Sequence, residues 1–216
     1  PATGGVLSQQ ARGLGQHFTD AEMKAIVDTA HSLGLKVAAH AHGARGIEAA
    51  ARAGVDSIEH GTFADADAIA AMKANGTALV PTLMAYTGIR DGLAKGVFTT
   101  AVAEKVRMTL DQVGQAARAA RAAGVPVIFG TDSAVYPHGR NAEEFAQLVE
   151  IVGMSPTEAL ASATTGAAKL IDMENEVGRI APGYSADIIA VSGNPLENIR
   201  VLEQVDWVMV RGESIE

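Results

Sequence analysis

The sequence predicts an α/β protein whose parallel β-sheet is buried on both faces. Helical patterns alternate along the chain with short apolar runs, and these runs are apolar almost throughout, as strands covered on both sides are. No GxGxxG or GxxxxGK loop follows any of them, so nothing supports a nucleotide-binding sheet. The pattern fits either a doubly wound sheet or part of a barrel. The polar residues at the strand ends, described below, favour a barrel.

The first helix and strand lead into the stretch LKVAAHAHG at 35–43. Residues 1–18 are rich in Gly, Ser and Gln, which is typical of a loop. Thr19 and Glu22 have the spacing of a capping box, so we expect a helix that begins there and ends at Gly34. The apolar run at 35–39 then predicts a strand.

Further helix and strand patterns follow in the same order. We expect helices over about 44–53 and 65–75, each followed by a strand, over 56–59 and 78–82 respectively. The next segment, 84–99, contains three glycines, which favour irregular structure.

The second half of the chain begins with one long pattern. An Ala-rich helix is predicted over about 100–123, and VPVIFG at 125–130 is the fourth expected strand. Residues 141–152 have a helical pattern, and Ser155 and Glu158 form a second capping box for a helix that runs to about residue 165. After residue 172 turn pairs separate short β-branched runs at 188–191 and 207–210, which indicates a small β module without a core of its own.

Composition excludes several classes of partner and ligand. The chain has 216 residues, only 17 of which are Lys or Arg, and a formal net charge of −8. With no basic run, neither nucleic acid nor an anionic membrane surface is an expected partner, and no apolar run approaches the roughly 20 residues of a membrane span. Without cysteine, any metal must be held by imidazole and carboxylate groups. Cytoplasmic and exported locations both stay open.

Possible metal ligands stand at three of the predicted strand ends. His40 and His42 are two positions apart, so they project from the same face of a strand, and His60 and Asp132 follow two other apolar runs. Carboxyl ends of parallel strands are where barrel active sites are built. Each residue also has an ordinary alternative: the histidines could be hydrogen-bonded core residues, and Asp132 could cap a turn. Their occurrence at equivalent strand ends favours catalysis.

The combined motifs resemble the amidohydrolase superfamily, in the branch of metal-dependent dipeptidases and carboxypeptidases related to imidazolonepropionase and prolidase-like enzymes. The matching segments are ATGGVLS, VAAHAHG, SIEHGT, FGTDS followed by YPHG, PGYSADIIAV and GNPLENI, in the order of the family. The resemblance implies that residues 1–172 are the C-terminal half of a (β/α)8 TIM barrel, strands 5 to 8. Residues 173–216 would be the C-terminal part of a small β-sandwich.

The resemblance also implies a set of functional residues. His40 and His60 match the fifth-strand and sixth-strand metal ligands, and Asp132 matches the eighth-strand aspartate that binds metal and shuttles the proton. In the family, a His-x-His pair and a carboxylated lysine complete a site for two zinc ions. Those residues lie upstream of Pro1, so we expect the missing N-terminal half of the same enzyme to supply them.

Three further residues are candidates for substrate binding. The family pattern makes His42 a substrate-contacting residue rather than a ligand, against the alternative of a packing role. His138 could contact substrate from the loop after the eighth strand, or be an exposed loop residue. Tyr86 could reach the carboxylate of a substrate or have a structural role in its loop.

The expected reaction is zinc-dependent hydrolysis of a small peptide that releases its C-terminal residue, with Xaa-Arg/Lys or Xaa-Pro substrates as alternatives. Asp132 would act as general base and then as general acid. We expect the assembled enzyme to be a homo-oligomer. Other hypotheses are hydrolysis of an imidazolone ring or an N-acyl amino acid, and a non-catalytic metal-binding fragment. A two-His-one-carboxylate iron oxygenase is disfavoured because its ligands would not lie on separate parallel strands.

Overall fold

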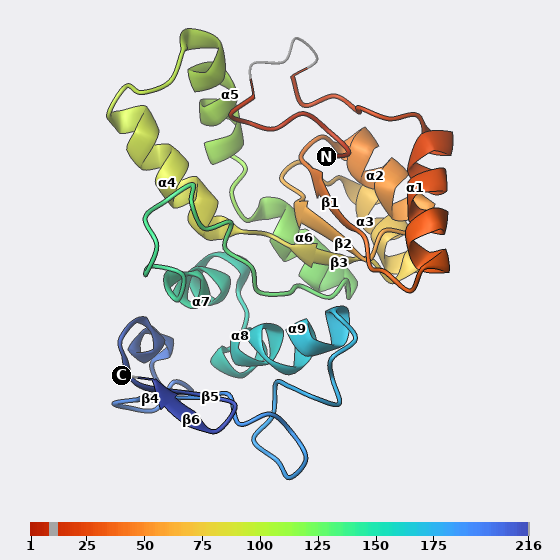
Figure 1. Cartoon of the computed structure of the whole chain (residues 1–216). Helices are drawn as coiled ribbons and strands as arrows, with labels where there is room; N and C mark the ends of the chain where they lie inside the picture. The colour runs from red at the N-terminus through yellow and green to blue at the C-terminus, as the bar shows by residue number, and fades with distance from the viewer. Residues whose placement is uncertain (9–12, 216) are drawn as a thin grey trace.

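The computed structural model describes residues 1–8 and 13–215. A parallel sheet and an antiparallel sheet lie in different parts of the structure, and helices of the chain segment 143–170 lie between them (Figure 1). The loop predicted over 1–18 includes residues 9–12, which lie outside the described residues. The α/β class predicted from the sequence is confirmed.

Three short strands form the parallel sheet. They are β1 (Ala38–Ala41), β2 (Ser57–His60) and β3 (Ala78–Val80), in the order β1-β2-β3, so that Ala39 pairs with Ile58 and Ile58 with Leu79. Along the free side of β1, the Ala2 N–H donates to the His40 carbonyl over 2.8 Å. The first residues of the chain therefore run beside the strand that carries His40.

The fourth predicted strand, 125–130, is only one isolated bridge. Val127 pairs in parallel with Leu79, and the Ile128 N–H donates to the Leu79 carbonyl. The Phe129 N–H then donates to the Ser162 carbonyl instead, so the backbone leaves β3 just before Asp132. The contact with Ser162 lies beyond what the apolar pattern of VPVIFG can indicate.

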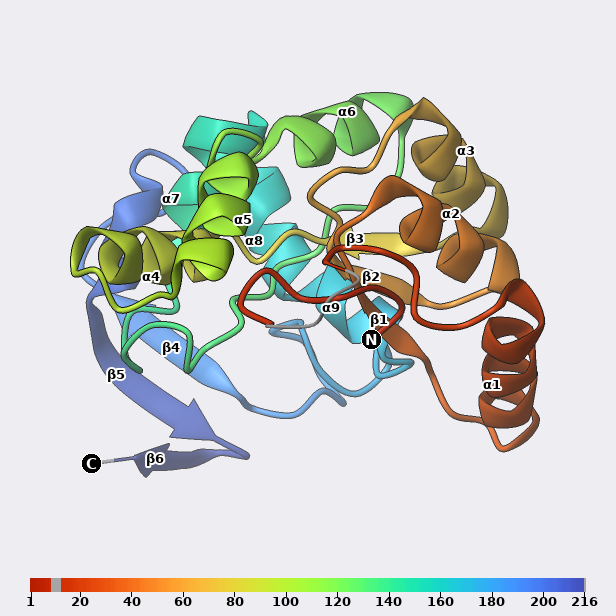
Figure 2. The same ribbon diagram turned by 90° about the horizontal axis from the view of Figure 1, so that it is seen from above.

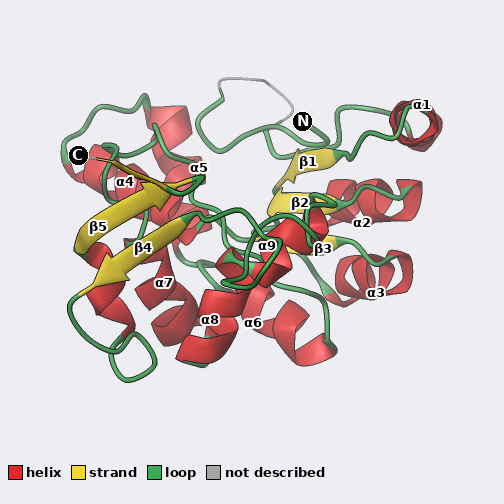
Figure 3. Cartoon of the chain, turned by 60° about the horizontal axis from the view of Figure 1, so that its bottom comes forward, coloured by secondary structure: helices red, strands yellow, loops and turns green. Residues whose placement is uncertain are grey.

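Helices from both halves of the chain pack with the sheet around the main apolar core. α1 (Asp20–Ser32), α2 (Ala44–Ala53) and α3 (Ala66–Asn75) follow one another along one side of the strands (Figure 3), and α6 (Gln115–Ala123) adds to the same core. The capping box at the start of α1 is confirmed, because the Glu22 N–H donates to the Thr19 hydroxyl and the Glu22 carboxylate accepts from the Thr19 N–H. The fully buried side chains of this core include Ile47, Ile58, Met72, Leu79 and Leu148.

The prediction of irregular structure over 84–99 is wrong for most of that segment. α4 (Leu83–Ala94) occupies it, and Gly88 and Gly92 lie inside the helix. A Cβ on Gly88 would lie 2.5 Å from the Val135 carbonyl oxygen, so this glycine permits close packing against the loop after Asp132. Tertiary packing outweighs the roughly 1 kcal/mol by which glycine disfavours a helix interior.

The long helix predicted over 100–123 is two helices. α5 (Thr100–Leu110) packs beside α4, as Figure 2 shows, and α6 begins after Gly114. Gly114 has a φ of 74°, and a Cβ there would meet the Ile151 side chain at 2.2 Å. This glycine therefore permits both the left-handed turn and the close contact that separate the two helices.

The helical segment between the two sheets has wider turns in its middle. α7 (Glu143–Gln147) continues as the π-helical segment η1 (Leu148–Val152), and α8 (Pro156–Ala163) and α9 (Thr165–Leu170) follow. The second predicted capping box is confirmed at α8, where Ser155 and Glu158 exchange hydrogen bonds.

The C-terminal module is an antiparallel sheet with most of its surface exposed. Its strands are β4 (Ile188–Val191), β5 (Val205–Val210) and β6 (Glu213–Ile215), with the short 3-10 helix η2 (Ile199–Glu203) before β5. Ile199 and Leu202 of η2 bury their side chains against Ala146 of α7. The sequence predicted β4 and most of β5, but not β6.

None of the helices that the structure describes has the length and apolarity needed to cross a membrane.

Candidate active site

Three imidazole rings meet at the carboxyl ends of β1 and β2. His40 lies in β1, His42 follows directly after the strand, and His60 is the last residue of β2. Their ring centroids are 4.7 to 4.8 Å apart, and one ring nitrogen from each lies within 4.8 Å of the others. The spacing of two along β1 and the pairing of Ala41 with His60 across the sheet bring the three together.

Two threonine hydroxyls contact the Nδ1 atoms of two of these rings. The Thr82 hydroxyl lies 2.6 Å from Nδ1 of His60 and donates its own proton to the Pro81 carbonyl. Nδ1 of His60 must therefore be the donor, which leaves Nε2 with a lone pair. The Thr62 hydroxyl lies 2.7 Å from Nδ1 of His42 and 2.5 Å from the Tyr86 hydroxyl.

Burial keeps the three imidazoles neutral. Burial, with a smaller contribution from the neighbouring rings, lowers the pKa of His42 to about 2 and that of His60 to about 3. Burial also lowers the pKa of His40. A neutral imidazole is the form that binds metal, because it has a free lone pair on one nitrogen.

A cavity of about 190 Å³ opens in front of the histidines. Asp132 lines it together with His40, His42 and His60. Asp132 has a φ of 51° and follows the segment 125–130, which runs beside β3. Partial burial raises the pKa of its carboxyl group. The rest of the lining is mostly apolar and includes the side chains of Val6, Leu7, Ala85, Ile89 and Val135.

The structure brings together five of the six residues singled out from the sequence. His40, His42, His60, Asp132 and Tyr86 all line the cavity, whereas His138 does not. His138 is exposed in the loop after Asp132, where its Nδ1 lies 3.0 Å from the Ser133 hydroxyl. Tyr86 is 3% exposed, and its hydroxyl contacts Thr62 behind His42.

Sequence reasoning missed the residues that support the rings. Thr62 comes shortly after the expected strand 56–59 and Thr82 is the last residue of the expected strand 78–82, so their positions at strand ends could have indicated them. Ile89 and Val135 gave no such signal, because they reach the cavity only through the packing of α4 against the loop after Asp132.

The donor set fits a metal ion. Three neutral imidazoles form a group that could hold an ion, and a carboxylate lines the same cavity. Nitrogen and oxygen donors without thiolate suit zinc and several other divalent metals. Chemically, such a set can bind a Lewis acid next to a carboxylate that accepts and returns a proton.

Comparison with known proteins matches the sequence motifs. The model of the amidohydrolase family matches residues 1–215. An uncharacterised protein of Mycobacterium tuberculosis is 38% identical over 216 residues, which are 96% of this chain and 55% of that protein. Ochratoxinase of Aspergillus niger is 36% identical over 210 residues, covering 94% of this chain and 42% of the enzyme.

A solved structure shows the same fold over the whole chain. It is a Xaa-Pro dipeptidase with methionine bound in its active site, 44% identical, with a TM-score of 0.95, and the match covers 100% of this chain and 53% of that one. The chain thus spans about half the length of the proteins it matches. The amidohydrolase family model matches nearly every residue, and the chain belongs to the amidohydrolase family.

Proposed function

We propose that the protein of which this chain forms part hydrolyses the amide bond of small peptides and releases the C-terminal residue. The observation that carries the proposal is the cavity lined by the Asp132 carboxyl and by three neutral imidazoles that lie together at the carboxyl ends of β1 and β2. The similarity to a Xaa-Pro dipeptidase and to ochratoxinase supports amide hydrolysis as the reaction class.

In this proposal His40, His60 and Asp132 are zinc ligands. A bound divalent ion supplies an acidified water and polarises the scissile carbonyl. Asp132 would take the proton of the attacking water and donate it to the leaving amine, because its carboxylate lines the cavity beside the histidines. His42 and Tyr86 orient the substrate from the cavity wall, and His138 contacts it after a movement of its loop.

The rest of the site belongs to a larger molecule. We propose that residues 1–172 are strands 5 to 8 of a (β/α)8 barrel and that residues 173–216 belong to a β-sandwich. The other half of the enzyme would supply a carboxylated lysine and further histidines for two zinc ions, and the assembled enzyme would be a homo-oligomer. An apolar groove beside β1, lined by Phe18, Ile26 and Val37 among others, supports the placement of further structure there.

The apolar lining of the cavity affects which side chain the released C-terminal residue can have. Val6, Ile89 and Val135 line the cavity together with the histidines, and within the described part of the cavity Asp132 is the one carboxylate. A basic side chain against this wall would lose hydration without gaining an ion pair. The wall therefore favours an apolar leaving residue, such as proline, over Arg or Lys.

Metal analysis and a substrate panel on the intact protein test the proposal. We expect bound zinc and hydrolysis of dipeptides, with turnover reduced at least 1000-fold in Asp132→Asn and unchanged in Asp111→Asn, a matched exposed control. Turnover of cyclic amides alone would favour the imidazolonepropionase-like alternative. A metal-free intact protein without turnover would refute the enzymatic function.

A further inference from the structure

A buried carboxyl group outside the lining of the cavity binds the start of α4. Glu144 of α7 is 0% exposed. Its Oε1 accepts from the Leu83 N–H at 2.9 Å and its Oε2 from the Met84 N–H at 2.7 Å. These are the first two residues of α4, whose N–H groups have no partner within the helix. Glu144 thus caps a helix that begins 61 positions upstream of it.

The residue just before these donors cannot cap the helix itself. Thr82 occupies the N-cap position with φ 50° and ψ 50°, and its side chain makes no capping bond. A β-branched residue in the left-handed region is strained, by roughly 1 to 3 kcal/mol, and persists only where its surroundings hold it. The hydrogen bonds that the Leu83 and Met84 N–H groups donate to Glu144 provide such a constraint.

The strained conformation of Thr82 places its hydroxyl against His60. That hydroxyl accepts from Nδ1 of His60 at 2.6 Å because its own proton goes to the Pro81 carbonyl. One turn further along α4, the Tyr86 hydroxyl contacts Thr62, which contacts Nδ1 of His42. The N-terminal turn of α4 therefore supports two of the three rings from behind.

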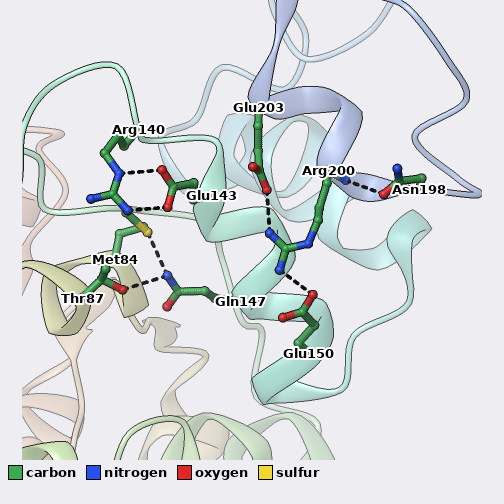
Figure 4. A network of polar contacts seen from close by, with 9 residues as sticks. All are labelled: Met84, Thr87, Arg140, Glu143, Gln147, Glu150, Asn198, Arg200 and Glu203. Atoms are coloured by element: carbon green, nitrogen blue, oxygen red, sulfur yellow. Dashed lines mark hydrogen bonds and ion pairs between the residues drawn. The ribbon is translucent and has the colours of Figure 1, made fainter.

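A second side chain of α7 also contacts α4. α7 is itself fixed to α4 by Gln147, whose side-chain amide nitrogen lies 2.8 Å from the Met84 sulfur and 3.1 Å from the Thr87 hydroxyl (Figure 4). Burial raises the pKa of Glu144 to about 8, although its two N–H donors act in the opposite direction. Burying a carboxyl group costs free energy of desolvation, and both oxygens of Glu144 bind the same backbone turn. This arrangement indicates a specific structural role for Glu144.

We propose that Glu144 is a positioning residue that sets the ring orientation and tautomer of His60, through the first turn of α4 and the Thr82 hydroxyl. It acts on the metal-binding competence of the site and not on the reacting atoms. The proposal deepens the proposed function, on which it rests for the role of His60.

The test compares Glu144→Gln with Glu143→Gln, the same substitution one residue earlier. Glu143 pairs with Arg140 at 2.6 and 2.7 Å and makes no described hydrogen bond to α4. Glutamine at position 144 keeps one acceptor but turns an NH₂ group towards the second backbone donor. Two readouts are used on the intact protein: the imidazole ¹⁵N signals of His60 in the metal-free protein, and zinc affinity by competition with a chelator.

We expect Glu144→Gln to shift the His60 signals away from the Nδ1–H tautomer and to weaken zinc binding about 10-fold or more, as loss of a group that orients a metal ligand does. Glu143→Gln should leave both readouts unchanged. Wild-type signals and wild-type affinity in a folded Glu144→Gln protein would overturn the proposal.

A second variant covers the case in which Glu144→Gln does not fold. Thr82→Ala removes only the hydroxyl and should produce the same shift of the His60 signals, whereas an unchanged His60 spectrum would overturn the proposal. Neither readout requires turnover, so absence of amide hydrolysis in the wild type would refute the proposed function alone.

Discussion

At the scale of single residues, the three histidines make the site dependent on pH. His42 is 4% exposed, and burial holds its pKa at about 2 in the folded chain, against about 6.5 when exposed. The unfolded chain therefore binds a proton below about pH 6.5 that the folded chain does not bind. Folding stability rises with pH wherever the unfolded state binds more protons. The contribution of His42 is complete above about pH 6.5 and is lost as the pH falls.

We predict that the metal-free protein loses stability below about pH 6.5 and that His42→Gln reduces this slope. One histidine of this kind contributes up to about 1.4 kcal/mol per pH unit. Glutamine cannot titrate but can still hydrogen-bond to Thr62. Urea unfolding at pH 7, 6 and 5 in the presence of a chelator measures the slopes. Equal slopes in the two proteins would show that His42 takes up a proton in the folded state.

At the scale of elements, α4 depends on glycines whose roles differ. A Cβ on Gly88 would meet the backbone of Val135, which is fixed in the loop after Asp132, at 2.5 Å from its carbonyl oxygen. A Cβ on Gly92 would meet the end of the Phe98 ring at 2.7 Å, and a side chain can rotate away. Only Gly88 is therefore required for α4 to pack where it does.

We predict that Gly88→Ala lowers both stability and turnover, whereas Gly92→Ala changes stability little or raises it. Both substitutions gain up to about 1 kcal/mol of helix propensity, so they are matched controls for each other. Overpacking at Gly88 should cost about 1 to 3 kcal/mol and displace Asp132. Thermal unfolding and steady-state kinetics measure both effects. A stabilised, fully active Gly88→Ala protein would contradict the packing argument.

The attachment of the C-terminal module to α7 has a polar and an apolar part. Arg200 of η2 pairs on the surface with Glu150 of η1, which continues α7, at 2.6 Å, and within η2 it also pairs with Glu203 at 3.0 Å (Figure 4). Leu202, 5% exposed, packs in the cluster with Ala146. Exposed ion pairs contribute little because water screens them, whereas a buried leucine contributes transfer free energy and fills space.

We predict that Leu202→Ala costs about 2 to 4 kcal/mol of stability and Arg200→Ala less than about 1 kcal/mol. Hydrogen exchange should show that Leu202→Ala loosens the segment 199–215 before the parallel sheet unfolds. A larger effect of Arg200→Ala would assign the attachment to the ion pairs instead.

At the scale of the whole molecule, the apolar wall of the cavity is assembled from distant parts of the chain. Val6, Ile89 and Val135 come from the N-terminal segment, α4 and the loop after Asp132, and Val102 and Val106 of α5 pack in the same cluster behind them. This cluster is separate from the core under the parallel sheet. The shape of the cavity can thus vary without disturbing the strands that hold the histidines.

We predict that Ile89→Ala lowers kcat/KM for dipeptides with an apolar C-terminal residue by about 10-fold, because about 1 to 2 kcal/mol of apolar contact is lost. Leu93→Ala is the control, since Leu93 packs in the same cluster but does not line the cavity. Equal losses in both variants would indicate a general effect on stability rather than on specificity.

Local features of both the fold and the site follow from the sequence alone. The spacing of His40 and His42, the capping boxes at Thr19 and Ser155 and the helix over 44–53 are local features, and periodicity within a few residues determines them. The resemblance to a known family follows from motifs that are equally short.

Tertiary structure decided what depends on distant contacts. It made α4 a helix despite its glycines, because Gly88 packs on Val135, and it reduced the run at 125–130 to one bridge, because Phe129 bonds to Ser162. It also joined Glu144 to Leu83, 61 positions away, and so reached His60. Residues so far apart meet only when the whole chain is packed, so no local pattern in the sequence could have indicated them.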